Sequence, residues 1–260
     1  MSSKPVTYVY CLVRAAQPPA FDGAPRGLAD AGPPRALDAG EGRWLVVADA
    51  PLERYSAERI EAGLRDLEWV GLRALEHEAL VEHLLRAGTV VPMKLFTLFL
   101  GDERAVADVR ARAAVLDELL DALEGKSEWG VRVLVDPVAA SDAVREQAES
   151  ESAAAASAGQ AFLMRKKRVL DASRNLRGEL RERAAELYDE LALLAADARS
   201  RPPLRGEGRL LLDASFLVRD EDAQAFHAAV GRRAESLAPA GVELALTGPW
   251  PAYNFVEGAP

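Results

Sequence analysis

Hydrophobic and polar positions change period several times along the chain, and the first half alternates strand-like and helical patterns. Val6 to Val13 read VTYVYCLV, a run of β-branched and aromatic side chains that predicts a strand. RWLVVADAPL, from Arg43, predicts a second strand. GTVVPMKLFTLF predicts a third, whose Pro92 should lie at an edge, at a bulge or at the strand's beginning. Residues 17–42 are rich in Pro, Gly and Ala without a period, which predicts an irregular loop.

Helical spacing follows the second and third of these runs. Ser56 is the expected N-cap of a helix that reaches about Trp69, and the helical spacing then continues from Leu75 to Leu85. Asp102 begins another helix, which Gly125 ends. The apolar side of this helix consists of Val106, Val109, Ala113, Leu116, Leu119, Leu120 and Leu123.

A new pattern begins after Gly125 with EWGVRVLVD, a predicted strand. No proline occurs from residue 138 to residue 201, and one unbroken helix of that length would project beyond a small domain, so we expect a break near Gly159. Apolar residues from Leu176 to Ala198 recur at alternating spacings of three and four, as in a coiled-coil seam. The run RLLLDASFLV, a helix from about Asp222 to Leu237 and the run VELALTG complete the pattern.

The order of these elements predicts an α+β protein with two domains. Strand, long helix, strand, helix and strand in the second half resemble part of a ferredoxin-like fold. Because strand and helix order restarts after Gly125, we expect an N-terminal α+β domain over residues 1–124. The expected C-terminal domain, over residues 125–260, is ferredoxin-like with long helices.

Composition narrows the functional classes. The net charge of −9 argues against an electrostatic binder of nucleic acid or anionic membranes, and the hydrophobic content of 49% is ample for a core. No stretch approaches the roughly 18 uninterrupted apolar residues of a membrane span, and MSSKPVTYVY lacks the apolar region of a signal peptide, so we expect a cytoplasmic protein. The single cysteine, Cys11, lies in an apolar run and fits a packing role in the core.

The sequence contains no local pattern that predicts catalysis. The best metal candidate is HEALVEH, which contains His77, Glu78, Glu82 and His83, but six residues leave the two imidazoles about 120° apart on a helix. His227 has no Cys or His near it, and no nucleophile elbow, Walker loop or dinucleotide-binding fingerprint is present. We therefore expect no enzyme, metal or cofactor. RKKR, from Arg165 to Arg168, fits a solvated helix turn better than a patch for an acidic partner.

Five blocks together resemble one known family. YVYCLV, HEALVEHLLRAGTVVPMKLFTLF, EWGVRVLVD, GQAFLMRKK and LTGPWPAYNFV stand in the order seen in the gas vesicle protein F/L family, so the resemblance covers Tyr8 to Val256. The most specific block is the C-terminal motif, in which a tryptophan stands between two prolines ahead of Tyr253 and Phe255. Lys94-Leu95-Phe96 replaces a common Arg-Phe-Gly, and Phe162 replaces a common tyrosine. These departures leave the F-like and L-like subtypes open.

The resemblance implies a non-enzymatic role in gas vesicles. Family members have an N-terminal α+β domain and a C-terminal modified ferredoxin-like domain, and the expected function is that of an accessory or minor shell protein in gas vesicle assembly. The implied partners are the hydrophobic major shell protein and other gas vesicle proteins, and no nucleic acid, membrane, cofactor or small-molecule substrate is implied. A small-molecule-binding regulatory protein is the alternative, since ferredoxin-like domains often bind metabolites.

Two regions are candidates for partner contact. The third predicted strand carries apolar side chains on both faces, so Met93, Leu95, Phe96 and Phe99 are the predicted partner-binding residues, with the two phenylalanines as anchors. The helical seam from Leu176 to Ala198 competes with this strand but is more often part of a core. The prolines of the C-terminal motif hold it extended, and docking on the protein's own body is favoured over partner contact. The motif comprises Gly248, Pro249, Trp250, Pro251, Tyr253 and Phe255.

Overall fold

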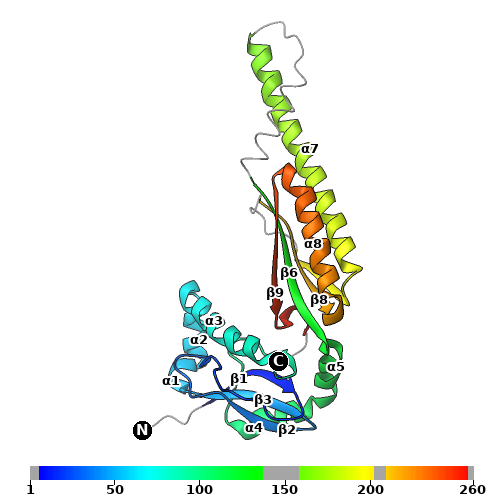
Figure 1. Ribbon diagram of the computed structural model, residues 1–260. Coiled ribbons are helices and arrows are strands. Elements are labelled where there is room, and N and C mark those ends of the chain that lie inside the picture. Colours follow the sequence, from blue (N-terminus) through cyan, green and yellow to red (C-terminus); the bar gives the residue numbers. More distant parts are fainter. Residues whose placement is uncertain (1–5, 137–157, 202–208, 257–260) are drawn as a thin grey trace. The chain divides into compact units, whose positions relative to one another are not determined.

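The computed structural model describes residues 6–136, 158–201 and 209–256, which form two compact units (Figure 1). Unit 1 comprises Met1–Lys126 and Trp250–Pro260, and unit 2 comprises Ser127–Pro249. The sequence-based division put the boundary two residues earlier and assigned the whole C-terminus to the second domain. The structure instead groups the tail with unit 1, because apolar side chains of the tail are buried there.

Unit 1 is built on an antiparallel sheet whose central strand is the first of the chain. The strand order is β2-β3-β1-β4, and β5 also pairs with β1. Helix α3 packs on one face of the sheet, and α4 and α5 lie on the other (Figure 1). Residues Val6 to Val13 are all buried as a result. The strands are β1 (Val6–Arg14), β2 (Arg35–Gly40), β3 (Arg43–Ala50), β4 (Thr89–Pro92) and β5 (Leu98–Phe99).

Two expectations for these strands need correction. Residues 17–42 are not loop throughout, because β2 lies within them as an edge strand. The third predicted strand is two short strands, β4 and β5, with Pro92 ending the edge strand β4. A turn separates them, in which Thr97 N donates to Lys94 O at 3.1 Å and Phe96 adopts a left-handed φ of 66°.

A bulge at Tyr10 decides which side chains of β1 meet α3. The register with β3 shifts between Val9 and Cys11, so Tyr10 is the extra residue. Tyr8 and Tyr10 therefore share a face with Cys11 and Val13, where simple alternation would place Cys11 on the opposite face. This face packs with Leu80, Val81 and Leu84 of α3.

Capping and breaks divide the helices of unit 1 more finely than expected. Ser56 caps α2, as predicted, by accepting from Arg59 N, but Asp66 then caps a separate helix, α3. The helix expected from Asp102 to Leu123 is broken at Arg112. The helices are α1 (Leu52–Tyr55), α2 (Ala57–Gly63), α3 (Leu67–Leu84), α4 (Asp102–Ala111) and α5 (Ala113–Leu123), and a short 3-10 turn, η3 (Tyr253–Phe255), ends the described chain.

Unit 2 has the ferredoxin-like arrangement. Its β-α-β-β-α-β order and its sheet order β7-β8-β6-β9 match the 4-1-3-2 strand order of that fold, which supports the α+β assignment. The sequence missed β7, whose residues DARSR lack apolar alternation. The elements are β6 (Lys126–Val135), α7 (Ala158–Ala192), β7 (Asp197–Arg201), β8 (Leu210–Arg219), η1 (Asp220–Asp222), α8 (Ala223–Leu237), η2 (Ala238–Ala240) and β9 (Val242–Trp250).

Helices α7 and α8 lie side by side against the sheet of unit 2 (Figure 1). The seam residues Leu180, Leu187 and Leu191 are buried in the core that α7 builds with Phe216 of β8. The helix ends at Ala192, so the last positions of the expected seam lie in a turn and in β7. Gly159 lies in the first turn of α7, and residues 137–157 ahead of it lie outside the described residues, so the break expected near Gly159 stays a prediction. No helix in the described ranges is long and apolar enough to cross a membrane.

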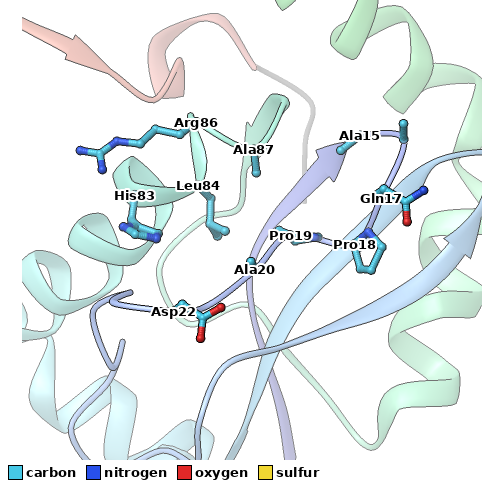
Figure 2. A pocket seen from close by; sticks show the side chains of 11 residues that line it. Ala15, Gln17, Pro18, Pro19, Ala20, Asp22, His83, Leu84, Arg86 and Ala87 are labelled. Atoms are coloured by element: carbon cyan, nitrogen blue, oxygen red, sulfur yellow. The ribbon is translucent and has the colours of Figure 1, made fainter.

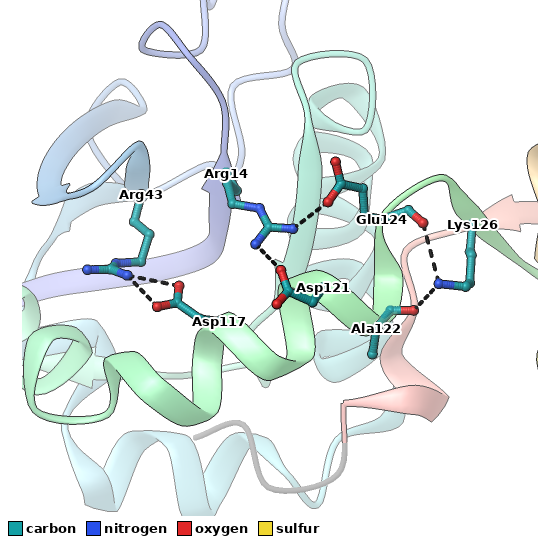
Figure 3. A network of polar contacts seen from close by, with 7 residues as sticks. All are labelled: Arg14, Arg43, Asp117, Asp121, Ala122, Glu124 and Lys126. Atoms are coloured by element: carbon teal, nitrogen blue, oxygen red, sulfur yellow. Dashed lines mark hydrogen bonds and ion pairs between the residues drawn. The ribbon is translucent and has the colours of Figure 1, made fainter.

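Two carboxylates of α5 and that of Glu124, directly after the helix, pair with two neighbouring arginines of the unit 1 sheet (Figure 3). Arg14 and Arg43 are opposite each other in the register of β1 and β3. Arg43 Nη1 donates to both carboxylate oxygens of Asp117 at 2.8 and 2.7 Å, and Arg14 donates to Asp121 at 2.5 Å and to Glu124 at 2.8 Å. Asp117 and Asp121, four residues apart, lie on one side of α5, and Glu124 follows at its C-terminal end. All three carboxylates offset the repulsion between the guanidinium groups.

The Arg43–Asp117 pair should contribute far more to stability than the Arg14–Asp121 pair. The Arg43 side chain is only 6% exposed, so Asp117→Asn leaves a buried guanidinium poorly paired, and we expect the free energy of unfolding to fall by about 2–3 kcal/mol. The Asp121 side chain is 71% exposed, so the matched variant Asp121→Asn should cost less than about 1 kcal/mol. Urea unfolding of both variants measures the difference, and equal losses would contradict this assignment.

Candidate functional site

A cluster of aromatic rings lies between the sheet of unit 1 and α3. Tyr8 on β1 has its hydroxyl 2.7 Å from His77 Nδ1, and Phe96 N donates to the same hydroxyl at 3.4 Å. That hydroxyl can donate to His77 Nδ1 while it accepts from Phe96 N, an arrangement that requires a neutral imidazole with its proton on Nε2. The cluster thus joins β1, α3 and the β4–β5 turn through one buried hydroxyl.

Tyr10 extends this cluster toward the loop that follows β1. Its ring centroid lies 4.8 Å from that of Tyr8 and 5.4 Å from that of His77, and its hydroxyl accepts from Leu28 N at 2.9 Å. Gly27 has a φ of 73°, and a Cβ there would lie 2.3 Å from the Tyr10 hydroxyl oxygen. The tyrosine therefore requires glycine at this turn.

The four predicted partner-binding residues differ in burial and in the contacts that they make within unit 1. Phe96 stacks on Trp69 of α3 with centroids 5.3 Å apart, so part of its surface is already used inside the unit. Leu95 and Phe99 are half-buried, with Phe99 opposite Thr7 in the sheet. Met93 is 1% exposed and packs in the interior. The turn thus presents Leu95, Phe99 and part of Phe96, while Met93 lies behind them.

The C-terminal motif connects the two units along the chain. Gly248 and Pro249, joined by a cis peptide bond, belong to unit 2, and the motif residues from Trp250 onward belong to unit 1. Gly248 has a φ of 125°, and a Cβ there would lie 2.8 Å from Glu128 O, so the strand end requires glycine. Phe255 is buried, whereas Trp250 remains 38% exposed.

Tyr253 places the tail against the aromatic cluster of unit 1. Its ring centroid lies 6.4 Å from that of His77. Burial raises the pKa of the Tyr253 phenol, and the nearby carboxylate of Glu78 raises it further, so the hydroxyl stays protonated. Docking on the protein's own body is therefore what the structure shows for Tyr253 and Phe255, while docking of Trp250 on the body stays a prediction.

Burial also sets the protonation of the other titratable groups in this region. It lowers the pKa of His77 to about 4, although the main chain of Met93 partly opposes the shift. It raises the pKa of Cys11, which is fully buried and keeps its thiol protonated. The described residues contain no group of three or more His, Cys, Asp and Glu side chains that could hold a metal ion. The chemistry of the cluster is that of packing and hydrogen bonding.

A shallow pocket of about 480 Å³ lies between the loop after β1 and the end of α3 (Figure 2). Alanine and proline side chains form much of its lining, and the Arg86 side chain extends away from the proline-containing loop. His83 faces this pocket, whereas His77 faces the core. The two imidazoles of the HEALVEH block are therefore separated, as their spacing of six residues predicts.

Sequence reasoning did not identify Tyr8, Tyr10 and Trp69 as partners of His77 and Phe96. The alternation in TYVYC could have placed both tyrosines on one face of β1. The stacking of Trp69 on Phe96 has no sequence signal, because it depends on the left-handed turn at Phe96.

Comparisons with known proteins find gas vesicle proteins as relatives over nearly the whole chain. The family model for gas vesicle synthesis protein GvpL/GvpF matches residues 6–257. Gas vesicle protein L of a Streptomyces species is 32% identical, covering 98% of this chain and 94% of the relative. Gas vesicle protein L2 of Halobacterium salinarum is 28% identical, covering 95% of this chain and 90% of the relative.

Two crystal structures share the fold. Gas vesicle protein GvpF from Anabaena superposes with a TM-score of 0.68 at 20% identity, covering 96% of this chain and 95% of that chain. GvpF from Microcystis aeruginosa gives a TM-score of 0.65 at 15% identity, covering 96% of this chain and 98% of that chain. At these identities the structural likeness establishes the fold alone.

Acid should destabilise the protein through His77. Its pKa is about 4 in the folded state and near its ordinary value of 6.5 when unfolded, so the unfolded state gains a proton first as pH falls. The stability associated with the neutral imidazole is present above about pH 6.5 and is lost toward pH 4, with about 2 kcal/mol lost between pH 7 and pH 5. His77→Asn keeps an acceptor near Nδ1 and should remove this part of the pH dependence.

Urea unfolding at pH 7 and pH 5 tests the assignment to His77. The control is His83→Asn, which removes a half-buried histidine from the same helix. If the control flattens the pH dependence as much as His77→Asn does, the assignment is wrong.

Loss of the Phe255 ring should loosen unit 1 rather than unit 2. Phe255→Ala removes a buried ring, and we expect the free energy of unfolding to fall by about 3 kcal/mol, against less than about 1 kcal/mol for the more exposed Trp250 in Trp250→Ala. Hydrogen exchange should show faster exchange in β1 and α3, with β8 and α7 unchanged. Faster exchange confined to β8 and α7 would contradict the docking of the tail on unit 1.

Proposed function

The chain belongs to the GvpL/GvpF family of gas vesicle synthesis proteins, and from this premise we propose that it binds the hydrophobic major shell protein during vesicle assembly. It acts without catalysis, as an accessory or minor shell protein. It works in the cytoplasm and at the vesicle, where other gas vesicle proteins are further partners. Neither a nucleic acid nor a membrane is a partner in this proposal, and no cofactor is required.

The observation that carries this proposal is the apolar surface around the β4–β5 turn. Phe99 and Leu95 are half-buried, and Leu100 immediately after β5 is 66% exposed. Strand β5 is two residues long, and among the described strands it pairs with β1 alone. A short apolar edge of this kind can accept another apolar chain by packing and by main-chain hydrogen bonds.

The need for such a partner follows from the hydrophobic effect. Exposed apolar surface costs about 25 cal/mol per Å² in water, so an apolar shell subunit tends to aggregate before it is incorporated. A protein that covers this surface reversibly delays aggregation without forming any covalent bond. The buried Cys11 and His77 fit such a role, because both are packed in the core rather than presented to a substrate.

The pocket between the loop after β1 and the end of α3 does not support the alternative of a metabolite-binding regulator. The pocket of about 480 Å³ lies in unit 1, whereas that alternative rests on the ferredoxin-like unit 2. Its polar groups do not converge on one point, since Arg86 extends away from the loop that carries Gln17 (Figure 2).

Co-expression with the major shell protein tests the proposal. Tagged wild-type protein should retain the shell protein on purification, and Phe99→Ser/Leu100→Ser should reduce the retained amount about ten-fold, since burial of two large apolar side chains is lost. Leu193→Ser is the matched control, because Leu193 is 87% exposed in unit 2. Phe96→Ser is a second variant, to be compared only if its circular dichroism matches wild type.

Two outcomes would count against this proposal. If wild-type protein retains no shell protein, the proposed binding is absent. If the folded double variant retains as much as wild type, the β4–β5 turn is not the binding surface.

A further inference from the structure

Helix α3 carries exposed apolar side chains on the side that faces solvent, beside the exposed carboxylates of Glu68 and Glu82. Its core side consists of Arg73, His77, Leu80, Val81 and Leu84. Its solvent side carries an exposed apolar stripe, defined as Leu67, Gly71, Leu72, Leu75 and Ala79. Leu67 is 86% exposed, Leu72 is 50% exposed and Leu75 is 69% exposed. Contiguous exposed apolar side chains of this kind mark protein interaction sites.

The spacing within the stripe suits another helix. Leu67, Gly71, Leu75 and Ala79 follow one another at intervals of four, which makes a row of alternating large and small residues about 18 Å long. Such rows pack into the grooves of a second helix, and the small residues allow the two backbones to come close.

Gly71 is the residue that the fold of this unit does not explain. It lies inside α3, where glycine costs about 0.5–1 kcal/mol relative to alanine. A Cβ at Gly71 would meet no atom within 4 Å, and its φ is not in the left-handed region. Neither packing within the chain nor backbone conformation requires glycine here, so close approach by an external helix is the remaining physical reason.

The charged residues beside the stripe favour one kind of partner helix. Glu68 and Glu82 are exposed near the two ends of the stripe, and neither carboxylate forms an ion pair with any described residue. Two exposed arginines flank the helix: Arg65, which pairs with Glu61, precedes it, and Arg86 follows it. A second copy of α3 packed antiparallel about Leu75 would bring Glu68 opposite Glu82 of that copy, which repels. A helix with Lys or Arg beside its apolar stripe pairs with both carboxylates.

We propose that the exposed apolar stripe of α3 binds an amphipathic helix of a partner protein that has basic residues along the edges of its apolar face. The surface is distinct from the β4–β5 turn, and the inference stands whether or not the shell protein is the partner at that turn. The partner's helix packs close to Gly71, and its basic side chains reach Glu68 and Glu82.

Two synthetic helical peptides of about five turns test the proposal, since they exceed the length of the stripe. Both carry the same leucine and alanine stripe, flanked in one by lysine and in the other by glutamate. Fluorescence anisotropy with the full-length protein should show the lysine peptide binding about ten-fold or more tighter than the glutamate peptide, as two charge pairs require. Glu68→Gln/Glu82→Gln should remove most of that preference.

Variants of the stripe separate packing from charge attraction. Leu67→Gln/Leu75→Gln keeps the charge of the protein and removes two exposed leucines, so it should weaken the lysine peptide about ten-fold or more. Gly71→Ala should raise the melting temperature and yet weaken binding, because the added methyl group stabilises the free helix and separates the two backbones. Gly231→Ala is the matched control, since Gly231 is exposed within α8 and its Cβ would also meet nothing. It should raise the melting temperature without affecting binding.

Three results would overturn the proposal. The first is equal binding of the lysine peptide to wild type and to folded Leu67→Gln/Leu75→Gln, which would indicate charge attraction without the stripe. The second is no binding of either peptide to wild type. The third is a wild-type dimer, seen by sedimentation, that dissociates in the leucine variant, which would make a second copy the occupant.

Discussion

Burial of β1 on both faces is the constraint on which unit 1 depends. The strand lies between β3 and β4, and its residues from Val6 to Val13 leave almost no surface to solvent. Both faces must therefore be covered by elements distant in sequence, with α3 on one side and α4 and α5 on the other. Tyr253 of the C-terminal tail packs beside His77 at this α3 face, so the final residues help to complete a core that the first strand begins.

Because the C-terminal tail belongs to unit 1, unit 2 is an insertion within unit 1 along the chain. The chain leaves unit 1 after Lys126 and returns to it at Trp250. The insertion is accommodated because unit 2 has its own core, in which Leu187 of α7 and Phe216 of β8 are fully buried. The C-terminal motif then contributes to the packing of both units, through different residues. Gly248 permits close approach to β6 at the end of one unit, and Phe255 fills the interior of the other.

Strands and helices with strong apolar periodicity can be predicted from the sequence. Elements made of polar or irregular segments cannot. Strands β1, β3 and β8 and helix α8 follow from their patterns, because one or both of their faces are buried. Edge strands β2 and β7 give no such signal, since they contact the core on limited surface. The bulge at Tyr10 cannot be read from VTYVYCLV, because the extra residue is fixed by the register with β3. The candidate site has the same limits, as the burial of Met93 and the stacking of Phe96 on Trp69 depend on the turn between two short strands.

Acidic residues beside apolar surface have a specific consequence for a protein that binds aggregation-prone chains. Such a protein must expose apolar side chains to its partner and must also avoid pairing with its own copies. On α3, Glu68 and Glu82 meet this requirement, because two copies of the stripe bring carboxylates together whereas a basic helix does not. The net charge of −9 acts in the same direction over longer distances. The net charge that argues against nucleic acid as a partner thus also disfavours the pairing of two copies through the exposed leucines of α3.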